Sequence, residues 1–512
     1  MTRAPALAGL LVALAAALPN AAAAQWRPPD VRAASTSLGD VLRAYATAAG
    51  TPDARYAQRR ERWTYAVRGR RLAVAVAVRD ADFRANVDLD GHEYAGGRSS
   101  GTRWRADANG IAHATLSDDQ GDAADRLPQS VFPFATSDCV LAGESTRFGP
   151  AWVLLDRAPH DKPHWLYVDA ATGRIAHEIT REGARTIVTS FDRFEPMGTM
   201  VRPRRWHVSD GDAAHDLDVT VDAIEPGAPS ALDVAPPQHQ RVFTAPSAER
   251  GVVTLPTVFR GPRIWVDVDV DGEHRRFVLD TGTASITLSA EVAERRRWSP
   301  LLEHASVPHM RAGALQLDDV STLTIPTGGF AGILGYDFFL GHVVHVDYAN
   351  RRVEVMTGAA AETPFHDPSA TVIDASFDEG IPLVHAAFGA ASGDRFTLDT
   401  GSPHLFVLAP FTRRWAGPVA EWTPSTFGRR GAIAAEDYLE GSIVVAARTA
   451  PAFTLGPARF ADLLVGIEQP NSRANAIDIA LDGIVGTDEM SRFDWWFDYD
   501  RGRIAMRRNG LR

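Results

Sequence analysis

The sequence predicts a mainly β protein: a curved antiparallel sheet with a short helix, followed by two related β lobes. Three observations support this prediction. Much of the chain consists of short runs of alternating apolar and polar residues separated by Asp-Gly, Asn-Gly and Thr-Gly turns, which is typical of antiparallel strands. A proline-rich segment at 227–250 interrupts this pattern, and the part after it contains an internal repeat. At 512 residues the chain is also too long for a single hydrophobic core.

Residues 1–24 are a predicted signal peptide. One positive charge at Arg3 precedes an apolar run and a series of small residues that ends at Ala24, which is the pattern of a cleaved leader. The apolar run is shorter than the roughly 20 residues that a membrane span needs, and no later stretch is long enough either. We therefore expect an exported protein, periplasmic or secreted, without a transmembrane segment.

Composition excludes several classes of function. The formal net charge of −11 argues against a nucleic-acid partner, because binding to phosphates requires a dense basic surface. The single cysteine, Cys139, cannot form an internal disulfide and is expected to be a small buried apolar residue. His160 and His164 have helical spacing, but Pro163 lies between them and no third ligand is near, so no metal site is predicted.

Residues 25–226 are predicted to form an antiparallel β-rich domain. Residues 37–50 carry apolar positions at helical spacing and end at Gly50, which predicts one short helix before the strands begin. In its pattern alone this region resembles the unclosed barrels of outer-membrane lipoprotein carrier proteins, which implies a lipid or lipoprotein ligand. The proline- and alanine-rich segment 227–250 reads as a linker.

The rest of the chain contains one unit twice. RRFVLDTG at 275–282 matches DRFTLDTG at 394–401, and a second pair of segments, 332–355 and 483–506, aligns without a gap. The two offsets differ, which places an insertion of 32 residues between the motifs of the second copy. We expect lobe 1 at 251–356, an inter-lobe loop at 357–368 and lobe 2 at 369–512. Two related lobes favour a site on the axis between them.

Four short motifs resemble the paired signatures of pepsin-like and retropepsin-like aspartic proteases. They are DTGT at 280–283, ILG at 333–335, DTGS at 399–402 and IVG at 484–486. The resemblance covers about residues 251–512, and the motifs follow in the family's order within each lobe. It implies a two-lobed pair of acid-protease-like β-barrels and an aspartic endopeptidase.

The resemblance implies a role for each motif residue. Asp280 and Asp399 would share one proton and activate a water molecule without a metal, a cofactor or a covalent intermediate. The other residues would support this pair: Thr281 and Thr400 by bracing the loops, and Gly282 and Gly401 by letting backbone amides approach the carboxylates. The substrate would be an extended peptide bound in strand fashion. The sequence predicts no oligomeric state.

Further residues around the motifs are expected to act through contacts. Thr283 and Ser402 can each donate a hydroxyl hydrogen bond to a carboxylate, which would lower the pKa of the pair and shift the pH optimum toward acid. Gly335 and Gly486 are small enough to pack against the catalytic loops. Residues 306–313 and 425–441 are candidate flaps over a cleft.

Other interpretations of the same residues remain open. Asp280 and Asp399 would also suit strand-end turns, or a silent pair in a non-catalytic exported binding protein whose N-terminal domain carries lipid or lipoprotein. The repeated Asp337 and Asp488 are expected to cap or brace a short helix. The repeated Asp-Tyr pairs at 347–348 and 498–499 are interpreted as strand-end residues without a chemical role.

Overall fold

The computed structural model forms two compact units, Met1–Gln238 and His239–Arg512. It describes residues 30–67, 69–89, 92–115, 139–156, 164–182, 185–213, 216–238, 240–244, 251–299, 304–325, 329–427, 433–438, 441–469 and 481–510. The predicted signal peptide, 1–24, lies outside these residues. The mainly β class is confirmed in both units, and no helix in the described part of the chain is long and apolar enough to cross a membrane.

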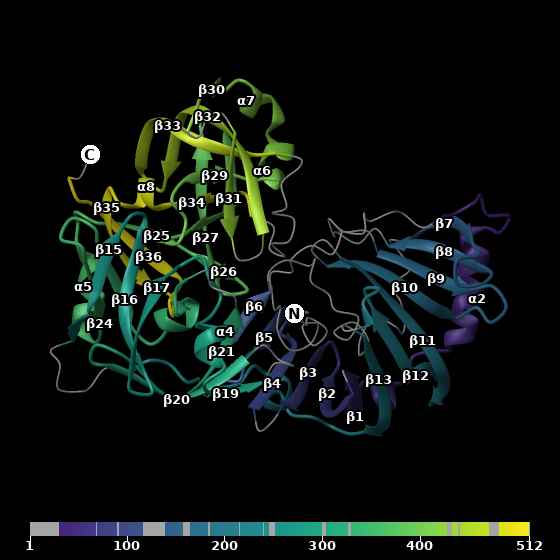
Figure 1. Ribbon diagram of the computed structural model, residues 1–512. Helices are drawn as coiled ribbons and strands as arrows, with labels where there is room; N and C mark the ends of the chain where they lie inside the picture. Colours follow the sequence, from purple (N-terminus) through teal and green to yellow (C-terminus); the bar gives the residue numbers. More distant parts are fainter. Residues whose placement is uncertain are drawn as a thin grey trace. The chain divides into compact units, whose positions relative to one another are not determined.

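The N-terminal unit is one antiparallel sheet of 13 strands, which bends strongly along its length (Figure 1). The strand order is β6-β5-β4-β3-β2-β1-β13-β12-β11-β10-β9-β8-β7, so nearly every strand pairs with its sequence neighbour and β1 pairs with β13. This is the curved sheet that the alternating pattern predicts. Cys139, at the start of β7, is buried as expected. The strands are β1 (Gln58–Val67), β2 (Arg70–Arg79), β3 (Asp82–Leu89), β4 (His92–Ser99), β5 (Thr102–Ala106), β6 (Ala112–Thr115), β7 (Cys139–Ser145), β8 (Ala151–Asp156), β9 (His164–Asp169), β10 (Ile175–Glu182), β11 (Arg185–Met197), β12 (Met200–Ser209) and β13 (Leu217–Pro226).

The predicted helix is present as α2 (Leu38–Ala49) and is followed by the turn η1 (Ala54–Tyr56). The Ser37 hydroxyl accepts a hydrogen bond from the Asp40 amide at 3.2 Å and so caps the first turn. Gly50 ends the helix with φ 78°, a conformation that glycine adopts without strain. Val41 and Tyr45 are buried against the sheet, so one face of α2 adds to the core of the N-terminal unit.

The segment predicted as a linker is more ordered than its composition suggests. The turn η5 (Leu232–Val234) contacts β2, β3 and β4 in the N-terminal unit, and Val234 is buried there. Phe243 is also buried, but in the C-terminal unit, where its ring meets Phe338 edge-on at 5.3 Å. The division between the two units falls within the predicted linker 227–250, and single apolar side chains on either side of it pack into the cores of the two units.

The C-terminal unit contains three sheets (Figure 1). The first lobe holds β15 (Thr257–Arg260), β16 (Arg263–Val270), β17 (Glu273–Leu279), β18 (Thr287–Ser289), β19 (Arg297–Ser299), β20 (His304–Ala312), β21 (Leu315–Ile325) and β22 (Gly332–Leu334), with α4 (Ala290–Ala293) and η6 (Tyr336–Phe339). The second lobe holds β26 (Ser376–Asp378), β27 (Ile381–Phe388), β28 (Ala391–Leu398), β29 (Leu405–Val407), β30 (Thr423–Pro424), β31 (Ile433–Tyr438), β32 (Gly441–Leu455), β33 (Ala458–Glu468) and β34 (Gly483–Val485), with α6 (Ala409–Arg414), α7 (Ala416–Ala420) and α8 (Thr487–Met490). The third sheet is built from β14 (Val252–Thr254), β23 (Val343–Asp347), β24 (Arg352–Met356), β25 (Thr371–Asp374), β35 (Phe493–Asp498) and β36 (Arg503–Arg508).

The sequence repeat is also a structural repeat. Lobe 1 has the strand order β16-β17-β22-β18-β21-β20, and lobe 2 repeats it as β27-β28-β34-β29-β33-β32. The third sheet has the order β14-β24-β23-β35-β36-β25 and so combines strands from both copies, with β23 and β35 paired at its centre. The two lobes therefore share a sheet, and the strands that carry the repeated motifs are held within one unit.

The inter-lobe segment 357–368 was expected to be a loop and is mostly helical. Helix α5 spans Ala359–His366 and contains Pro364. Three consecutive alanines begin it, and alanine has the highest helix propensity. Glu362 forms ion pairs with Arg501 at 2.9 Å and Arg503 at 2.8 Å, which hold the helix against the C-terminal strands.

The first flap candidate is wrong. Residues 306–313 lie mostly within β20, which pairs with β19, β21 and β16. Val307, Met310 and Ala312 are fully buried. A strand with partners on both sides and an apolar inner face belongs to the core of the lobe, so this segment cannot act as a cover. Parts of the second candidate, 425–441, lie outside the described residues.

Candidate active site

Two equivalent loops carry the Asp-Thr-Gly motifs. In lobe 1, β17 runs parallel to β22, and the Asp280 amide donates to the Leu334 carbonyl at 3.0 Å. In lobe 2, β28 runs parallel to β34, and the Asp399 amide donates to the Val485 carbonyl, again at 3.0 Å. The parallel pairing fixes where each strand ends, so both aspartates occupy the same position in their lobes.

The structure brings Asp280 and Asp399 face to face. A hydrogen bond joins their carboxyl groups. A Cβ atom added to Gly282 would stand 2.6 Å from the Asp399 carboxyl carbon, and one added to Gly401 would overlap the Asp280 carboxylate. Each glycine therefore leaves the space that the opposite carboxyl group occupies, and any larger residue there would push the pair apart.

Backbone amides orient both carboxylates. The Gly282 amide donates to Asp280 Oδ1 at 2.8 Å, and the Gly401 and Ser402 amides donate to Asp399 Oδ1 at 2.7 and 3.0 Å. These bonds favour the charged form, but burial disfavours it more strongly. Burial raises the pKa of Asp280, and burial together with the neighbouring Asp280 carboxyl raises the pKa of Asp399 well above its usual range. The pair is therefore suited to hold one proton and one negative charge.

Thr281 and Thr400 join the two loops by reciprocal hydrogen bonds. The Thr281 hydroxyl donates to the Leu398 carbonyl at 2.7 Å and accepts from the Thr400 amide at 3.0 Å. The Thr400 hydroxyl donates to the Leu279 carbonyl at 2.8 Å and accepts from the Thr281 amide at 3.1 Å. Both side chains are fully buried. Four bonds thus cross the symmetry axis beneath the carboxyl pair and fix the separation of the loops.

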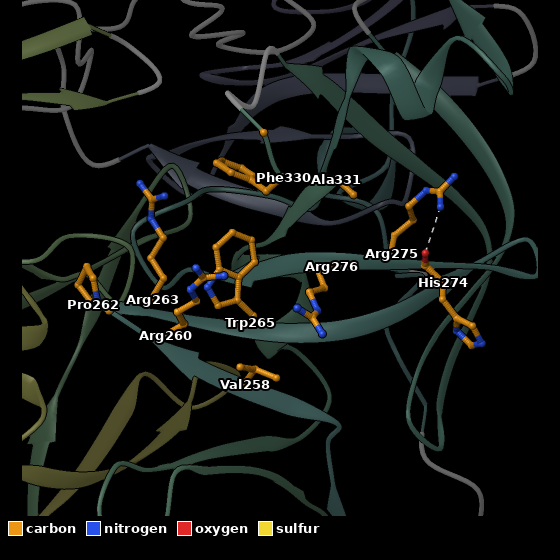
Figure 2. A pocket seen from close by; sticks show the side chains of 12 residues that line it. Val258, Arg260, Pro262, Arg263, Trp265, His274, Arg275, Arg276, Phe330 and Ala331 are labelled. Atoms are coloured by element: carbon orange, nitrogen blue, oxygen red, sulfur yellow. Dashed lines mark hydrogen bonds between the residues drawn. The ribbon is translucent and has the colours of Figure 1, made fainter.

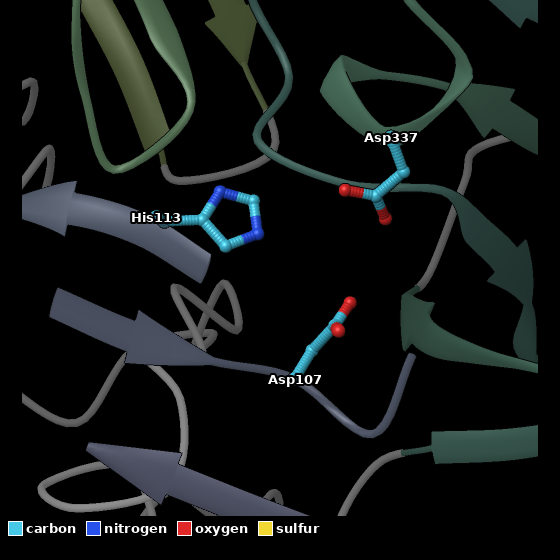
Figure 3. A group of neighbouring side chains, drawn as sticks. All are labelled: Asp107, His113 and Asp337. Carbon is cyan, nitrogen blue, oxygen red and sulfur yellow. The ribbon is translucent and has the colours of Figure 1, made fainter. Parts of the chain in front are cut away.

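The glycines of the second motifs lie against the backbone of the two Asp-Thr-Gly loops. A Cβ on Gly335 would meet the Thr283 carbonyl oxygen at 2.5 Å, and one on Gly486 would meet the His404 amide nitrogen at 2.6 Å. Asp337, labelled in Figure 3, accepts from the Ile286 amide at 3.1 Å, and Asp488 contacts His404 Nδ1 at 2.7 Å. Of the two expected roles of these aspartates, the structure shows bracing of the loops and no side-chain cap on either short helix.

Thr283 and Ser402 each donate a hydrogen bond to one of the two carboxylates. The Thr283 hydroxyl hydrogen-bonds to Asp280 and lowers the pKa of that carboxyl group, which opposes the larger effect of burial. Ser402 reaches Asp399 through its backbone amide. A substitution of the side chain would therefore remove a carboxylate donor at Thr283 but leave the amide donor at Ser402 in place.

Two tyrosines near the pair were interpreted from the sequence only as strand-end residues. Tyr348 and Tyr499 are repeat equivalents, both buried, and neither hydroxyl has a hydrogen-bond partner among the described residues. Burial and the nearby Asp399 raise the pKa of the Tyr348 phenol, and burial raises that of Tyr499 with smaller contributions from Tyr336, Asp280 and Asp399. The repeated Asp-Tyr spacing was a signal in the sequence, but burial next to the aspartates depends on how the two lobes pack.

In the N-terminal unit, Asp107 and His113 lie on either side of the turn between β5 and β6 (Figure 3). Asp107 Oδ1 accepts from the Asn109 amide at 2.9 Å and from the Ile111 amide at 3.1 Å. These are the hydrogen bonds of an aspartate that stabilises a turn. Asp107 is therefore accounted for by the local backbone of its own unit.

Comparisons with known proteins give weak likenesses. No protein-family model matches the chain, and no curated protein matches it. Among solved structures, an aspartic proteinase from Irpex lacteus aligns over 51% of this chain and 98% of its own, with 12% identity and a TM-score of 0.31. A LolA superfamily protein from Nitrosomonas europaea aligns over 39% and 98%, with 11% identity and a TM-score of 0.29. Basic 7S globulin from soybean aligns over 50% and 94%, with 10% identity and a TM-score of 0.31. At these values none of the three assigns an activity to this chain.

Proposed function

We propose that the C-terminal unit is an aspartic endopeptidase. One observation supports this above all: two aspartates from repeated loops face each other, joined by a hydrogen bond and braced from below by two threonines. Holding two acidic groups together in a buried place is costly, because one of them must stay protonated. A turn or a structural scaffold does not require two adjacent carboxyl groups. Acid–base hydrolysis requires one proton donor and one proton acceptor next to the bond that is cleaved.

In the proposed reaction Asp280 is the base and Asp399, the more deeply buried of the two, carries the proton. A water molecule between them loses a proton to Asp280 as its oxygen attacks the peptide carbonyl carbon. Asp399 gives its proton to the carbonyl oxygen, so a neutral gem-diol forms. A proton then passes from Asp280 to the amide nitrogen, the C–N bond breaks, and Asp399 recovers a proton from the diol. Every proton is returned, and no metal or cofactor is required.

The proposed substrate is an extended protein segment, bound through backbone hydrogen bonds in strand fashion. We further propose that the protein works after export, in the periplasm or outside the cell, as the leader-like N-terminus suggests. A carrier-like role for the N-terminal unit remains compatible with this function, since that unit has its own core.

The direct test is hydrolysis of a denatured protein by the full chain between about pH 3 and pH 8. We expect cleavage that a transition-state mimic with a central hydroxyl group inhibits, because the hydroxyl takes the place of the water between the carboxyl groups. Product peptides are measured by mass spectrometry. Absence of cleavage at every pH, with lipid or lipoprotein binding by the same preparation, would favour the non-catalytic binding protein instead.

Replacing Thr283 with alanine should shift the pH dependence of kcat/KM. The Thr283 hydroxyl stabilises the Asp280 carboxylate, so its removal raises the pKa of Asp280 further. Because Asp280 must be ionised to act as the base, the acidic limb of the profile should move to higher pH by roughly one unit. Thr283→Ser is the matched comparison, since it keeps a hydroxyl group at the position that donates to Asp280. An acidic limb that stays in place in Thr283→Ala would contradict this assignment of the base.

A further inference from the structure

A cavity of about 710 Å³ lies on lobe 1 of the C-terminal unit. Its walls are the outward face of strands β15, β16 and β17, the turn at Gly261 and Pro262, and residues 329–331 (Figure 2). Strand β16 alternates buried and outward-facing residues, so Arg263 and Trp265 face outward while Ile264 and Val266 enter the core. The cavity is thus formed by side chains that the fold does not use for its own core.

Positive charge dominates this cavity. Its lining includes Arg260, Arg263, Arg275, Arg276 and His274, and no aspartate or glutamate. This is a strong local excess, because the whole chain has 64 acidic and 53 basic residues. A cleft lined by one sign of charge attracts ligands of the opposite sign.

Within the described residues, only two of the four arginines in this lining form ion pairs. Arg276 pairs with Asp267 at 3.0 Å, and Arg275 pairs with Glu273. Within the described residues, no carboxylate lies within ion-pair distance of Arg260 or Arg263. Both are exposed residues at the mouth of the β15–β16 hairpin, where they pair across the strands. Two like charges placed opposite each other repel, and an anionic ligand would relieve that repulsion.

Aromatic rings hold part of this charge in position. The Arg263 guanidinium lies over the Phe330 ring at 5.8 Å, and Trp265 meets the same ring edge-on at 6.3 Å. A guanidinium that rests on a ring loses less freedom when it binds a ligand than a free side chain does. The planar fork of arginine also matches the geometry of a carboxylate.

One arginine of the cavity, Arg263, lies near Asp280. Strands β16 and β17 are antiparallel, and Trp265 pairs with Val278. Arg263 is two residues before Trp265 and Asp280 is two residues after Val278, so the register places Arg263 opposite Asp280. The charge of Arg263 also acts on Asp280, whose pKa it lowers slightly against the dominant effect of burial. Arg276 lies four residues before Asp280 on the same strand, which is roughly 13 Å at the rise of a β-strand. Arg263 and Arg276 therefore lie within about four residues of extended chain from Asp280.

We propose that this cavity binds acidic side chains of the substrate, aspartate or glutamate, within about four residues of the bond that is cleaved. The inference rests on the proposed endopeptidase function and adds the class of substrate. An acidic peptide segment suits this cavity better than a phosphate-bearing lipid, because Arg263 and Arg276 lie on the two strands next to Asp280, within about four residues of it. A lipid headgroup would need no such proximity.

The test uses matched peptides. Sites of cleavage are first mapped in denatured protein, and peptides are then made with glutamate or glutamine at each of four positions on either side of the bond. We expect the glutamate peptide to have a kcat/KM about tenfold higher at one or more positions, as one charge-assisted contact in a partly exposed site would give. The preference should fall as ionic strength rises. Arg260→Glu should abolish or invert it.

The control is Arg459→Glu, the same change at an exposed strand arginine of lobe 2 outside the cavity, which should keep the preference for glutamate. Binding of the same peptides to the full-length Asp280→Asn variant gives a second measurement that does not need activity. Equal binding and equal cleavage of the two peptides would overturn the inference while leaving the endopeptidase in place. Binding of anionic lipid vesicles through Arg260, without a preference among peptides, would also overturn it.

If the wild-type chain cleaves nothing, the proposed endopeptidase function fails. The binding comparison would then test only whether the cavity binds acidic peptides. Tighter binding of the glutamate peptide that is lost in Arg260→Glu would support an acidic-peptide site. The two failures are therefore distinguishable.

Discussion

Replacing Asp399 with asparagine is expected to lower kcat for peptide hydrolysis by at least about a thousandfold, because the amide cannot supply the proton that the carbonyl oxygen receives. The side chain keeps its size, and its Oδ1 can still accept from the Gly401 and Ser402 amides. Hydrolysis of the mapped peptides in the full chain measures the effect. Asp394→Asn, on the same strand but exposed, is the matched control and should keep normal activity.

The same substitution should separate activity from stability. Burial raises the pKa of Asp399, so the folded state holds this proton more tightly than the unfolded chain does. The stability linked to this group is complete below its usual pKa near 3.8 and is lost as pH rises toward the raised value. Asparagine does not ionise, so Asp399→Asn does not lose stability at this position as the pH rises. We therefore expect the C-terminal unit of the variant to gain thermal stability relative to wild type between about pH 4 and pH 7.

If Asp399→Asn unfolds at a much lower temperature than wild type, its loss of activity would be explained by loss of the folded structure. A variant that folds normally and still cleaves peptides would remove Asp399 from the reaction. Only a stable and inactive protein supports the proposed role.

The aspartate pair could be predicted from the sequence because the Asp-Thr-Gly motif is local and occurs twice. Each Asp-Thr-Gly follows an apolar strand, and the repeat requires equivalent places for Asp280 and Asp399 in two similar lobes. The bracing of the loops by Thr281 and Thr400 was expected from the resemblance to aspartic proteases and not from the repeat itself. The repeat in the sequence thus identified the two aspartates, and the structure gives their hydrogen bonds and burial.

Features that depend on distant parts of the chain were missed. The basic cavity combines β16 and β17 with Phe330, which lies more than fifty residues further along. Burial of Tyr348 and Tyr499 near the carboxyl pair depends on the sheet shared by both copies. The segment 357–368 was predicted to be a loop, but helix α5 forms there and the ion pairs of Glu362 stabilise it. In each case a tertiary contact outweighs the local pattern.

Replacing Thr400 with valine should destabilise the C-terminal unit by about 2 to 4 kcal/mol, because two buried backbone groups lose their partners. The Leu279 carbonyl would lose the hydroxyl that donates to it at 2.8 Å, and the Thr281 amide would lose its acceptor at 3.1 Å. No water reaches either group, since both threonines are fully buried. Denaturant unfolding of the full chain, followed in the C-terminal unit, measures the change, and the loosened loops should also lower kcat.

Thr397→Val, three residues earlier and within β28, provides the matched control. Thr397 is also buried, at 2% exposure, but its hydroxyl has no hydrogen-bond partner among the described residues. Exchanging that hydroxyl for a methyl group should leave stability unchanged or raise it by up to about 1 kcal/mol, because an unsatisfied polar group is removed. The contrast between the two valines isolates the hydrogen bonds from the change in shape. Equal losses at both positions would mean that Thr281 and Thr400 contribute only packing, and that the separation of the two aspartates is set elsewhere.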